Sequence, residues 1–249
     1  MNLRTLLADL PHTFLFVGLP YAAVLSFFVG TILRYRAKPF GVSSLSSQFL
    51  ETRRLFWAVL PFHIGILAVF FGHLSAWLLP GTLLLWNSYP ARLIVLEVSA
   101  FTFGLCVFAG LAGLLLRRLT NQRVRMETSR MDVALELLLL AQTILGLWIA
   151  LGYRWGSSWF AADLAPYLTS LVKLDPNIAA ISAMPTVIQL HVVGAFAILA
   201  MFPFTRLMHL LVVPLHYLVR PYQRVIWNWD RKAIRDPATP WSKARPRNN

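Results

Sequence analysis

The residues of this chain that offer the most chemistry are four histidines set in apolar stretches. His63 and His73 stand ten residues apart in FHIGILAVFFGH, a stretch without a charged residue, and His191 and His209 stand 18 apart in LHVVGAFAILAMFPFTRLMH. Ionisable side chains at membrane depth are rare and usually mark a functional site. A single such histidine would often serve a hydrogen bond between helices, but four of them indicate ligand binding.

The spacings predict how the imidazoles pair if each stretch is one helix. Eighteen residues make five full turns, so His191 and His209 would share a face about 27 Å apart along the axis. His63 and His73 would lie about 15 Å apart and differ in direction by about 80°. With the two helices antiparallel, His73 meets His191 at one depth and His63 meets His209 at the other.

Two facing imidazoles at each of two depths suit six-coordinate iron in a porphyrin, which needs axial ligands and an apolar pocket. Zinc prefers four clustered ligands, and these pairs are too far apart to form one cluster. A lone cysteine, Cys106, rules out a C-x-x-C-H attachment. The sequence therefore predicts two non-covalent haems of the b type. Small residues beside the histidines would let a flat macrocycle approach, although each alone is equally suited to helix packing: Gly65, Gly72, Gly194 and Ala195.

Composition places these histidines in a membrane. Of 249 residues, 57% are hydrophobic and only 13% charged, whereas soluble domains carry about 25% charged residues. Runs of about 20 apolar residues can cross a hydrocarbon core of about 30 Å. The predicted fold is an all-α integral membrane protein with both haems stacked between the second and fifth of five transmembrane helices. These helices are expected at about 12–34, 55–80, 91–116, 132–153 and 185–213.

The first span is expected to be uncleaved, because it ends in arginines and lacks a cleavage motif. His12 and His216 fall at or beyond the edges of spans and are interpreted as interfacial. Asp132 and Glu136 lie near the start of the fourth span, where a helix N-terminus favours carboxylates, and are interpreted as capping groups.

The formal net charge of +13 could indicate nucleic-acid binding, but the charges lie in loops and in the tail. The first loop, the third loop and the tail are basic, whereas the second loop has no basic residue and the fourth has only Arg154 and Lys173. The positive-inside rule then puts the N-terminus outside and the C-terminus in the cytoplasm. Residues 1–219 are predicted to form the di-haem domain, and 220–249 a basic cytoplasmic tail for partner or membrane-surface contact.

The fourth loop contains SSWFAADLAPYLTSLVKL, which alternates apolar and polar residues at helical spacing. It is predicted to be a surface helix in the outer interface. A lid over a ligand site is the alternative interpretation.

At the histidine segments the sequence resembles the gamma subunit of respiratory nitrate reductase, a membrane di-haem cytochrome b. The ten- and eighteen-residue spacings match that family, as do the FPFTRLMH end with Pro203 and Arg206 and the stretch RRLTNQRVR after the third span. The likeness covers nearly all of residues 12–222.

The resemblance implies that quinol is oxidised near the outer haem of a bacterial inner membrane. Electrons would pass through the inner haem to the iron–sulfur clusters of a beta subunit and to molybdenum in an alpha subunit, in anaerobic respiration and nitrate assimilation. Nitrate would not be reduced on this chain, which lacks ligands for those centres. His73 and Arg92 are the candidate partners of the quinone oxygens, with Gly72 beside them.

The sequence departs from the family at three places. Arg92 is the nearest match to a family lysine early in the third span, and arginine is a wider donor with a permanent charge. Pro61, two residues before His63, should kink the second span near the inner haem. The tail beyond Pro221 is longer than the family pattern.

Two alternatives stay open. One is a quinone-linked cytochrome b of another reductase or of an oxidase, which only the neighbouring subunits would separate from the nitrate enzyme. The other is a transporter or membrane anchor whose histidines bind a transition metal or a proton. Transporters tend to have inverted repeats and broken helices, which the sequence does not display.

Overall fold

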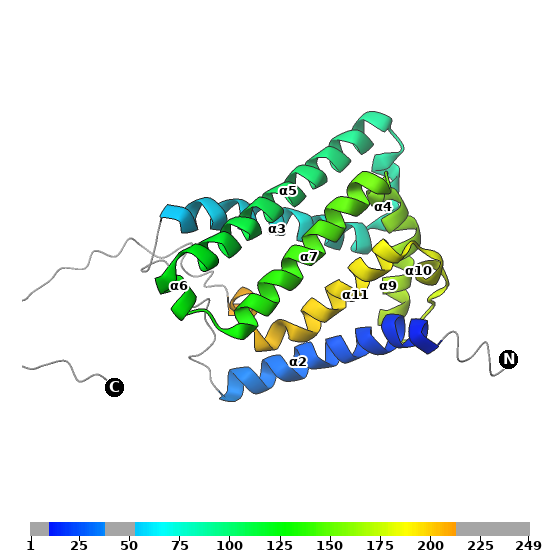
Figure 1. Cartoon of the computed structure of the whole chain (residues 1–249). Helices are drawn as coiled ribbons and strands as arrows, with labels where there is room; N and C mark the ends of the chain where they lie inside the picture. Colours follow the sequence, from blue (N-terminus) through cyan, green and yellow to red (C-terminus); the bar gives the residue numbers. More distant parts are fainter. Residues whose placement is uncertain (1–9, 38–52, 213–249) are drawn as a thin grey trace, which may run out of the picture. The chain divides into compact units, whose positions relative to one another are not determined.

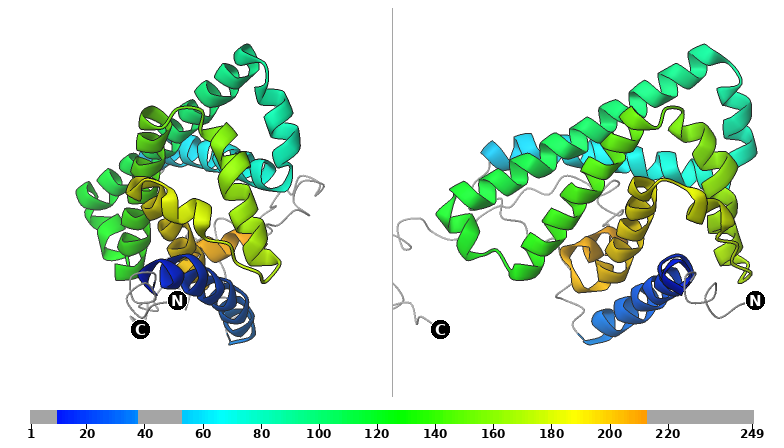
Figure 2. Two further views of the ribbon diagram at one scale, coloured as in Figure 1. Left: turned by 90° about the vertical axis from the view of Figure 1, so that its right-hand side faces the viewer. Right: turned by 45° about the vertical axis from the view of Figure 1, so that its right-hand side comes forward.

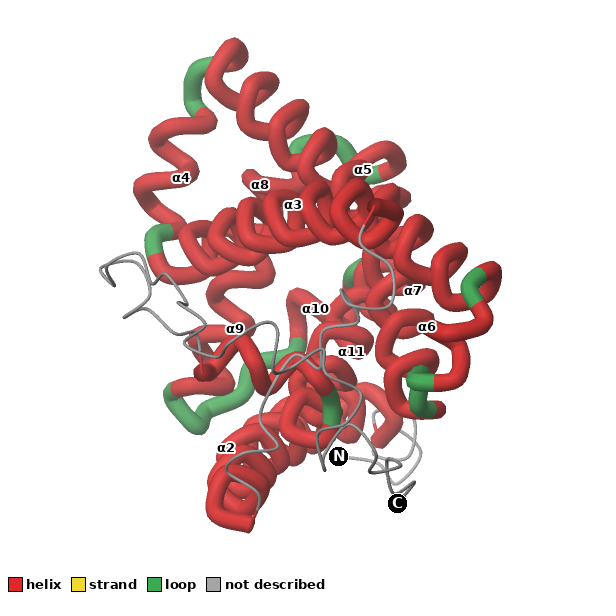
Figure 3. Tube along the Cα trace, turned by 90° about the vertical axis from the view of Figure 1, so that its left-hand side faces the viewer, coloured by secondary structure: helices red, strands yellow, loops and turns green. Residues whose placement is uncertain are grey.

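The computed structural model describes residues 10–37 and 53–212, and this part of the chain is helical, without a strand (Figure 3). Five of its helices are long and apolar enough to cross a membrane, and each begins within a few residues of its predicted position. The all-α membrane class is therefore confirmed. The tail 220–249 and His216 lie outside the described residues. The five helices are Leu10–Ala37, Leu55–Leu78, Pro90–Thr120, Arg130–Gly152 and Thr186–Phe204.

Large apolar side chains remain exposed along these helices. Leu25 is 65% exposed, Trp57 70% and Leu151 67%. In water such a surface would be unfavourable, whereas lipid tails solvate it. The exposed apolar surface thus agrees with the membrane class.

Helices α3 (Arg53–Leu78) and α5 (Pro90–Thr120) cross in close contact (Figure 1). A Cβ on Gly65 would lie 2.6 Å from the Phe103 carbonyl oxygen, and one on Gly110 would lie 2.6 Å from Phe62 Cβ. Glycine at both positions lets the two backbones approach. Pro61 lies inside α3, which continues through it as one helix. This crossing fixes the helix that carries His63 and His73.

Helix α11 (Thr186–Met201) packs against both α2 (Leu19–Ala37) and α7 (Arg130–Gly152), as two views show (Figures 1 and 2). A π-helical turn, Phe14–Gly18, precedes α2. The short helix α6 (Gln122–Met126) joins α5 to α7 and is capped by the Asn121 side chain. The predicted capping role of Asp132 is confirmed, because it forms a reciprocal capping box with Ser129 at the start of α7.

Helical connections cover the other end of the bundle. The chain passes from α3 to α5 through α4 (Pro80–Asn87). Between α7 and α11 it forms α8 (Gly156–Trp159), a π-helical turn Phe160–Leu164, α9 (Ala165–Val172) and α10 (Ala179–Ala183).

The helical character predicted for the fourth loop is confirmed, but its surface position is wrong for one face. Leu164 and Tyr167 are buried in a core with Phe16, Ile149 and Ile181. The Tyr167 hydroxyl donates to the Phe16 carbonyl at 2.7 Å, and burial raises the pKa of this phenol. The loop is packed into the fold because its apolar stripe covers the start of the first span.

The fifth span differs from its prediction. Regular α-helix ends at Met201 and is followed by two 3-10 segments, η4 (Phe202–Phe204) and η5 (Arg206–Val212), separated by Thr205 in an extended conformation. Pro203 has no N–H to donate, so an α-helix cannot bond normally through it. The five-turn register that predicted a common face for His191 and His209 is therefore wrong beyond Met201.

Candidate functional site

The two histidines of α3 are held in the same way. His63 Nδ1 lies 2.9 Å from the Val59 carbonyl oxygen, and His73 Nδ1 lies 2.8 Å from that of Val69. A carbonyl oxygen only accepts, so the ring proton sits on Nδ1 in both bonds. In the neutral ring this leaves the lone pair on Nε2, the nitrogen that can bind iron.

His209 repeats this arrangement on η5. Its Nδ1 lies 2.5 Å from the Arg206 carbonyl oxygen, which again leaves Nε2 with a free lone pair. Three of the four predicted ligands thus share one hydrogen-bonding pattern, although they lie on different elements. An axial ligand of haem iron needs this state of the ring.

His191 lies in α11 and is held by packing against α7. Its Nδ1 is buried without a hydrogen-bond partner among the described residues, and a Cβ on Gly146 would lie 3.1 Å from its Cε1. Gln142 donates to the His191 carbonyl at 2.8 Å. Gly146 and Gln142 were not singled out in the sequence, because their role appears only when α7 and α11 are brought together.

The structure brings His73 and His191 near each other. The two rings are close enough to interact electrostatically, and the Phe160 ring packs edge-on against His73 with 5.5 Å between centroids. In residues 10–37 and 53–212, no hydrogen bond, ion pair or ring contact joins His73 to His191, His63 to His209 or Arg92 to His73. The outer pair is therefore supported by proximity alone, and neither pair is joined by a direct contact in this part of the chain.

The small residues beside the histidines divide into two groups. Gly65 and Gly194 serve helix packing, because a Cβ there would meet the Phe103 carbonyl oxygen and the Gln142 amide oxygen. A Cβ on Gly72 would meet nothing within 4 Å, and His63, Gly72 and His73 are all exposed. Together with the free Nε2 atoms, this open strip of α3 fits a flat macrocycle with axial imidazoles. These residues would hold a porphyrin.

Arg92 stands in the first turn of α5. Its guanidinium lies over the Tyr89 ring at 4.5 Å and over the Trp86 ring at 5.1 Å, and the residue is exposed. Such stacking holds an arginine without neutralising it. Arg92 therefore presents a fixed cation at the end of α5.

A half-buried carboxylate in α5, that of Glu97, was missed by the sequence reasoning. Glu97 Oε1 accepts from the Ser157 backbone N–H at 2.8 Å and from the Ser157 hydroxyl at 2.6 Å, and Asn87 donates to Ser157 and Ser158. Since Phe160 of the same turn touches His73, residues 157–160 connect Glu97 of α5 to His73 of α3. An acidic residue inside a predicted span was the signal that could have drawn attention to it.

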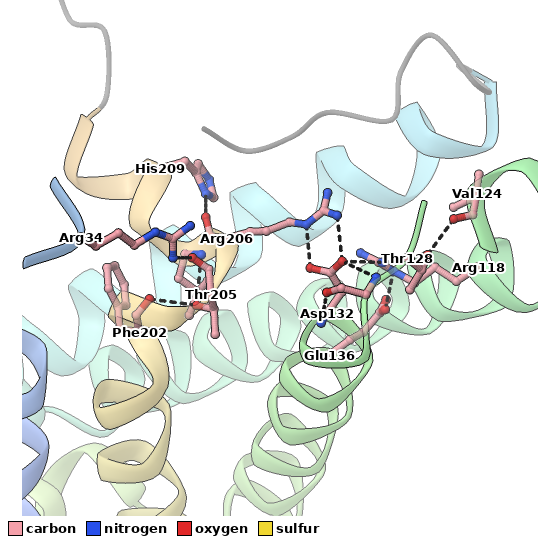
Figure 4. A network of polar contacts seen from close by, with 12 residues as sticks. Arg34, Arg118, Val124, Thr128, Asp132, Glu136, Phe202, Thr205, Arg206 and His209 are labelled. Carbon is pink, nitrogen blue, oxygen red and sulfur yellow. Dashed lines mark hydrogen bonds and ion pairs between the residues drawn. The ribbon is translucent and has the colours of Figure 1, made fainter. Parts of the chain in front are cut away.

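A second polar cluster surrounds the start of α7 at the other end of the bundle (Figure 4). Asp132 is bound by Arg206, while Glu136 lies 2.7 Å from Arg118 as an ion pair. Sequence reasoning assigned both carboxylates to capping. It missed their arginine partners, one of which lies 74 residues away in the chain.

Comparison with known proteins gives one consistent result. Residues 12–228 match the family model of the nitrate reductase gamma subunit. The chain is 36% identical over 210 residues to the respiratory nitrate reductase 2 gamma chain of Escherichia coli strain K12, which covers 83% of this chain and 92% of that protein. It is 30% identical over 211 residues to the nitrate reductase gamma chain of Bacillus subtilis strain 168, covering 82% and 93%.

Proposed function

Because this chain belongs to the nitrate reductase gamma subunit family, we propose that it is the quinol-oxidising cytochrome b of a nitrate reductase complex. His73 and His191 would be the axial ligands of an outer haem b, and His63 and His209 those of an inner haem b. The observation that carries this proposal is the Nδ1 hydrogen bond of His63, His73 and His209, which leaves Nε2 free. When bound, the two haems supply one-electron carriers between the outer and inner sides.

The chain's own residues would bind quinol beside the outer pair. Gly72 leaves room next to His73, and the stacked Arg92 guanidinium is a candidate donor to a quinone oxygen. Oxidation of quinol to quinone releases two protons and two electrons. The protons would leave on the outer side, and the electrons would move inward.

The proposed setting is a bacterial inner membrane, with the N-terminus outside and the C-terminus in the cytoplasm. Basic residues gather in the last turns of α2 and α5 and in α6, which supports this orientation. An iron–sulfur beta subunit and a molybdenum-containing alpha subunit on the cytoplasmic side would then take the electrons.

Haem counting tests the ligand assignment. The purified complex should contain two non-covalent haems in this chain, by pyridine haemochrome, and each of His63→Ala, His73→Ala, His191→Ala and His209→Ala should leave one. His12→Ala is the matched control and should keep both. A fully assembled wild-type chain with fewer than two haems would refute the assignment.

The quinol site needs its own test. Arg92→Ala should slow haem reduction by quinol while leaving the haem spectra unchanged, whereas Arg154→Ala, which removes another exposed arginine of the outer loops, should not. Equal rates in wild type and Arg92→Ala would remove Arg92 from the site. Mass spectrometry of the co-purified subunits would separate the nitrate enzyme from other quinone-linked complexes.

A further inference from the structure

Arg206 is tied to Asp132 by two parallel bonds. Its Nε donates to Asp132 Oδ1 at 2.6 Å and its Nη2 to Oδ2 at 2.7 Å. This fork geometry fixes the guanidinium in direction as well as in distance. The pair joins the start of α7 to the first residue of η5 (Figure 4).

Asp132 is itself immobilised before it meets Arg206. Its side chain is only 6% exposed. Asp132 Oδ2 accepts from the Ser129 N–H at 3.0 Å, and the Asp132 N–H donates to the Ser129 hydroxyl at 3.1 Å. Helix α7 therefore sets where this carboxylate stands, and the carboxylate sets where Arg206 stands.

The backbone on the other side of Arg206 is fixed from α2. Arg34 Nη1 donates to the Pro203 carbonyl at 2.6 Å and to the Thr205 carbonyl at 2.9 Å. Thr205 Oγ1 accepts from the Leu207 N–H at 3.3 Å and so caps the start of η5. The stretch before His209, residues 203–206, is thus held by hydrogen bonds with two helices, α2 and α7.

The position of the Arg206 backbone reaches His209 through one hydrogen bond, which His209 Nδ1 donates to the Arg206 carbonyl. We propose that Asp132 and Arg206 are positioning residues for His209: through the Arg206 carbonyl they set the orientation of the imidazole and the electron density on its Nε2. This inference rests on the proposed function, in which His209 is a ligand of the inner haem. Asp132 acts through Arg206 and does not touch the haem itself.

The chain contains a matched control for a purely structural role. Glu136 pairs with Arg118 at 2.7 Å and lies one turn further along α7, with a side chain that is also 6% exposed. This pair joins α5 to α7 and so contributes to the same end of the bundle. Arg118 Nη1 also lies 4.0 Å from Asp132 Oδ2, so the two ion pairs adjoin, but no hydrogen bond or ion pair joins Glu136 to His209 among the described residues.

The experiment compares Asp132→Asn with Glu136→Gln in the full complex. Loss of a partner of this kind typically weakens metal binding by about 10- to 100-fold, so Asp132→Asn should lower inner-haem occupancy. The remaining inner haem should show a shifted low-spin electron paramagnetic resonance signal and a shifted potential. The outer haem of the same molecules should be unchanged. Glu136→Gln should leave both haems as in wild type.

Arg206→Lys serves where Asp132→Asn does not assemble. Lysine keeps the charge but loses the two parallel bonds, so the inner-haem signal should shift, again without an effect on the outer haem. An unchanged inner-haem signal and potential in Asp132→Asn or in an assembled Arg206→Lys would overturn the inference, and so would an equal change in Glu136→Gln. A wild-type chain without two haems would instead refute the proposed function.

Discussion

A histidine ring has two nitrogens, and the backbone of this protein engages one of them. His63 and His73 bond to the carbonyl four residues earlier, whereas His209 bonds to the carbonyl three residues earlier. This difference follows from the helix type, since α3 is an α-helix and η5 is a 3-10 helix. The same hydrogen bond of Nδ1 is thus formed in two types of helix.

Pairing by depth gives a prediction for single residues. His191→Ala should abolish the same haem spectrum as His73→Ala, because the proposed pairing makes both rings ligands of the outer haem. His209→Ala should abolish the other spectrum, in common with His63→Ala. Low-temperature difference spectra of the four variants measure this. Loss of a common haem in His63→Ala and His191→Ala would contradict the pairing.

The open space at Gly72 gives a second prediction. Gly72→Ala should not lower the unfolding temperature of haem-free protein, because the added methyl group meets nothing within 4 Å and alanine favours a helix over glycine. The same variant should weaken haem or quinol binding if that space is where they lie. Gly81→Ala adds a methyl group in equally open space on α4, and binding should be unaffected there.

The packing of α3 against α5 depends on close backbone contact at two glycines. Gly65 and Gly110 stand at the crossing of α3 and α5, where added atoms would meet backbone and cannot be accommodated by a rotamer change. The sequence predicted these helices from hydropathy alone, and it named Gly65 as a residue suited to packing or to haem. Only the observed crossing of α3 and α5 shows that Gly65 serves helix packing.

Gly110→Ala is therefore expected to destabilise the protein by about 1–3 kcal/mol. Since α3 carries His63 and His73, haem occupancy should fall in parallel. Thermal unfolding in detergent, followed by circular dichroism, measures the first effect. Gly81→Ala is again the control, and equal stability of Gly110→Ala and wild type would show that the helices can separate without cost.

Sequence reasoning reached the five spans and the four histidines because both leave local signals, an apolar run and an ionisable residue within it. It did not reach the end of α11, since apolar residues 202–204 and 207–208 lie on both sides of Thr205 and Arg206 and extend the apolar stretch past the end of the α-helix. Nor did it pair Asp132 with Arg206, which are brought together only by the packing of distant elements. The tail and its contacts lie outside the described residues and stay a prediction.

At the scale of the whole molecule, basic side chains gather at one end of the described helices. Arg34, Arg36, Arg117 and Arg118 lie in the last turns of α2 and α5. His209 of the proposed inner pair lies at the same end, because it bonds to Arg206, beside the contacts of Arg34 and Arg118 (Figure 4). Electrons moving toward this end against a typical membrane potential would cost about 2.3 kcal/mol per charge per 100 mV. The proposed inner haem therefore needs an acceptor there.

The tail supplies a prediction at this scale. Residues 220–249 carry eight basic residues, interleaved with Tyr222, Trp227 and Trp229, and arginine and aromatic residues are enriched at protein interfaces. Deleting residues 221–249 should release the partner subunits, while both haems stay bound and are still reduced by quinol. Deleting only 237–249 should retain the partners. Full partner stoichiometry after the larger deletion would make the tail a lipid contact.

The broken end of the fifth span also bears on how the chain is inserted into the membrane. The carbonyl groups of Ala200, Pro203 and Thr205 accept hydrogen bonds from Ser26 and Arg34 of α2. In hydrocarbon, unsatisfied carbonyls cost several kcal/mol each, so this segment cannot settle in lipid by itself. Helix α2 is synthesised first, and more than 160 further residues must be made before the segment that it binds, residues 200–205, is available. During insertion, the face of α2 that carries Ser26 and Arg34 must therefore stay free of other helices until α11 leaves the insertion machinery.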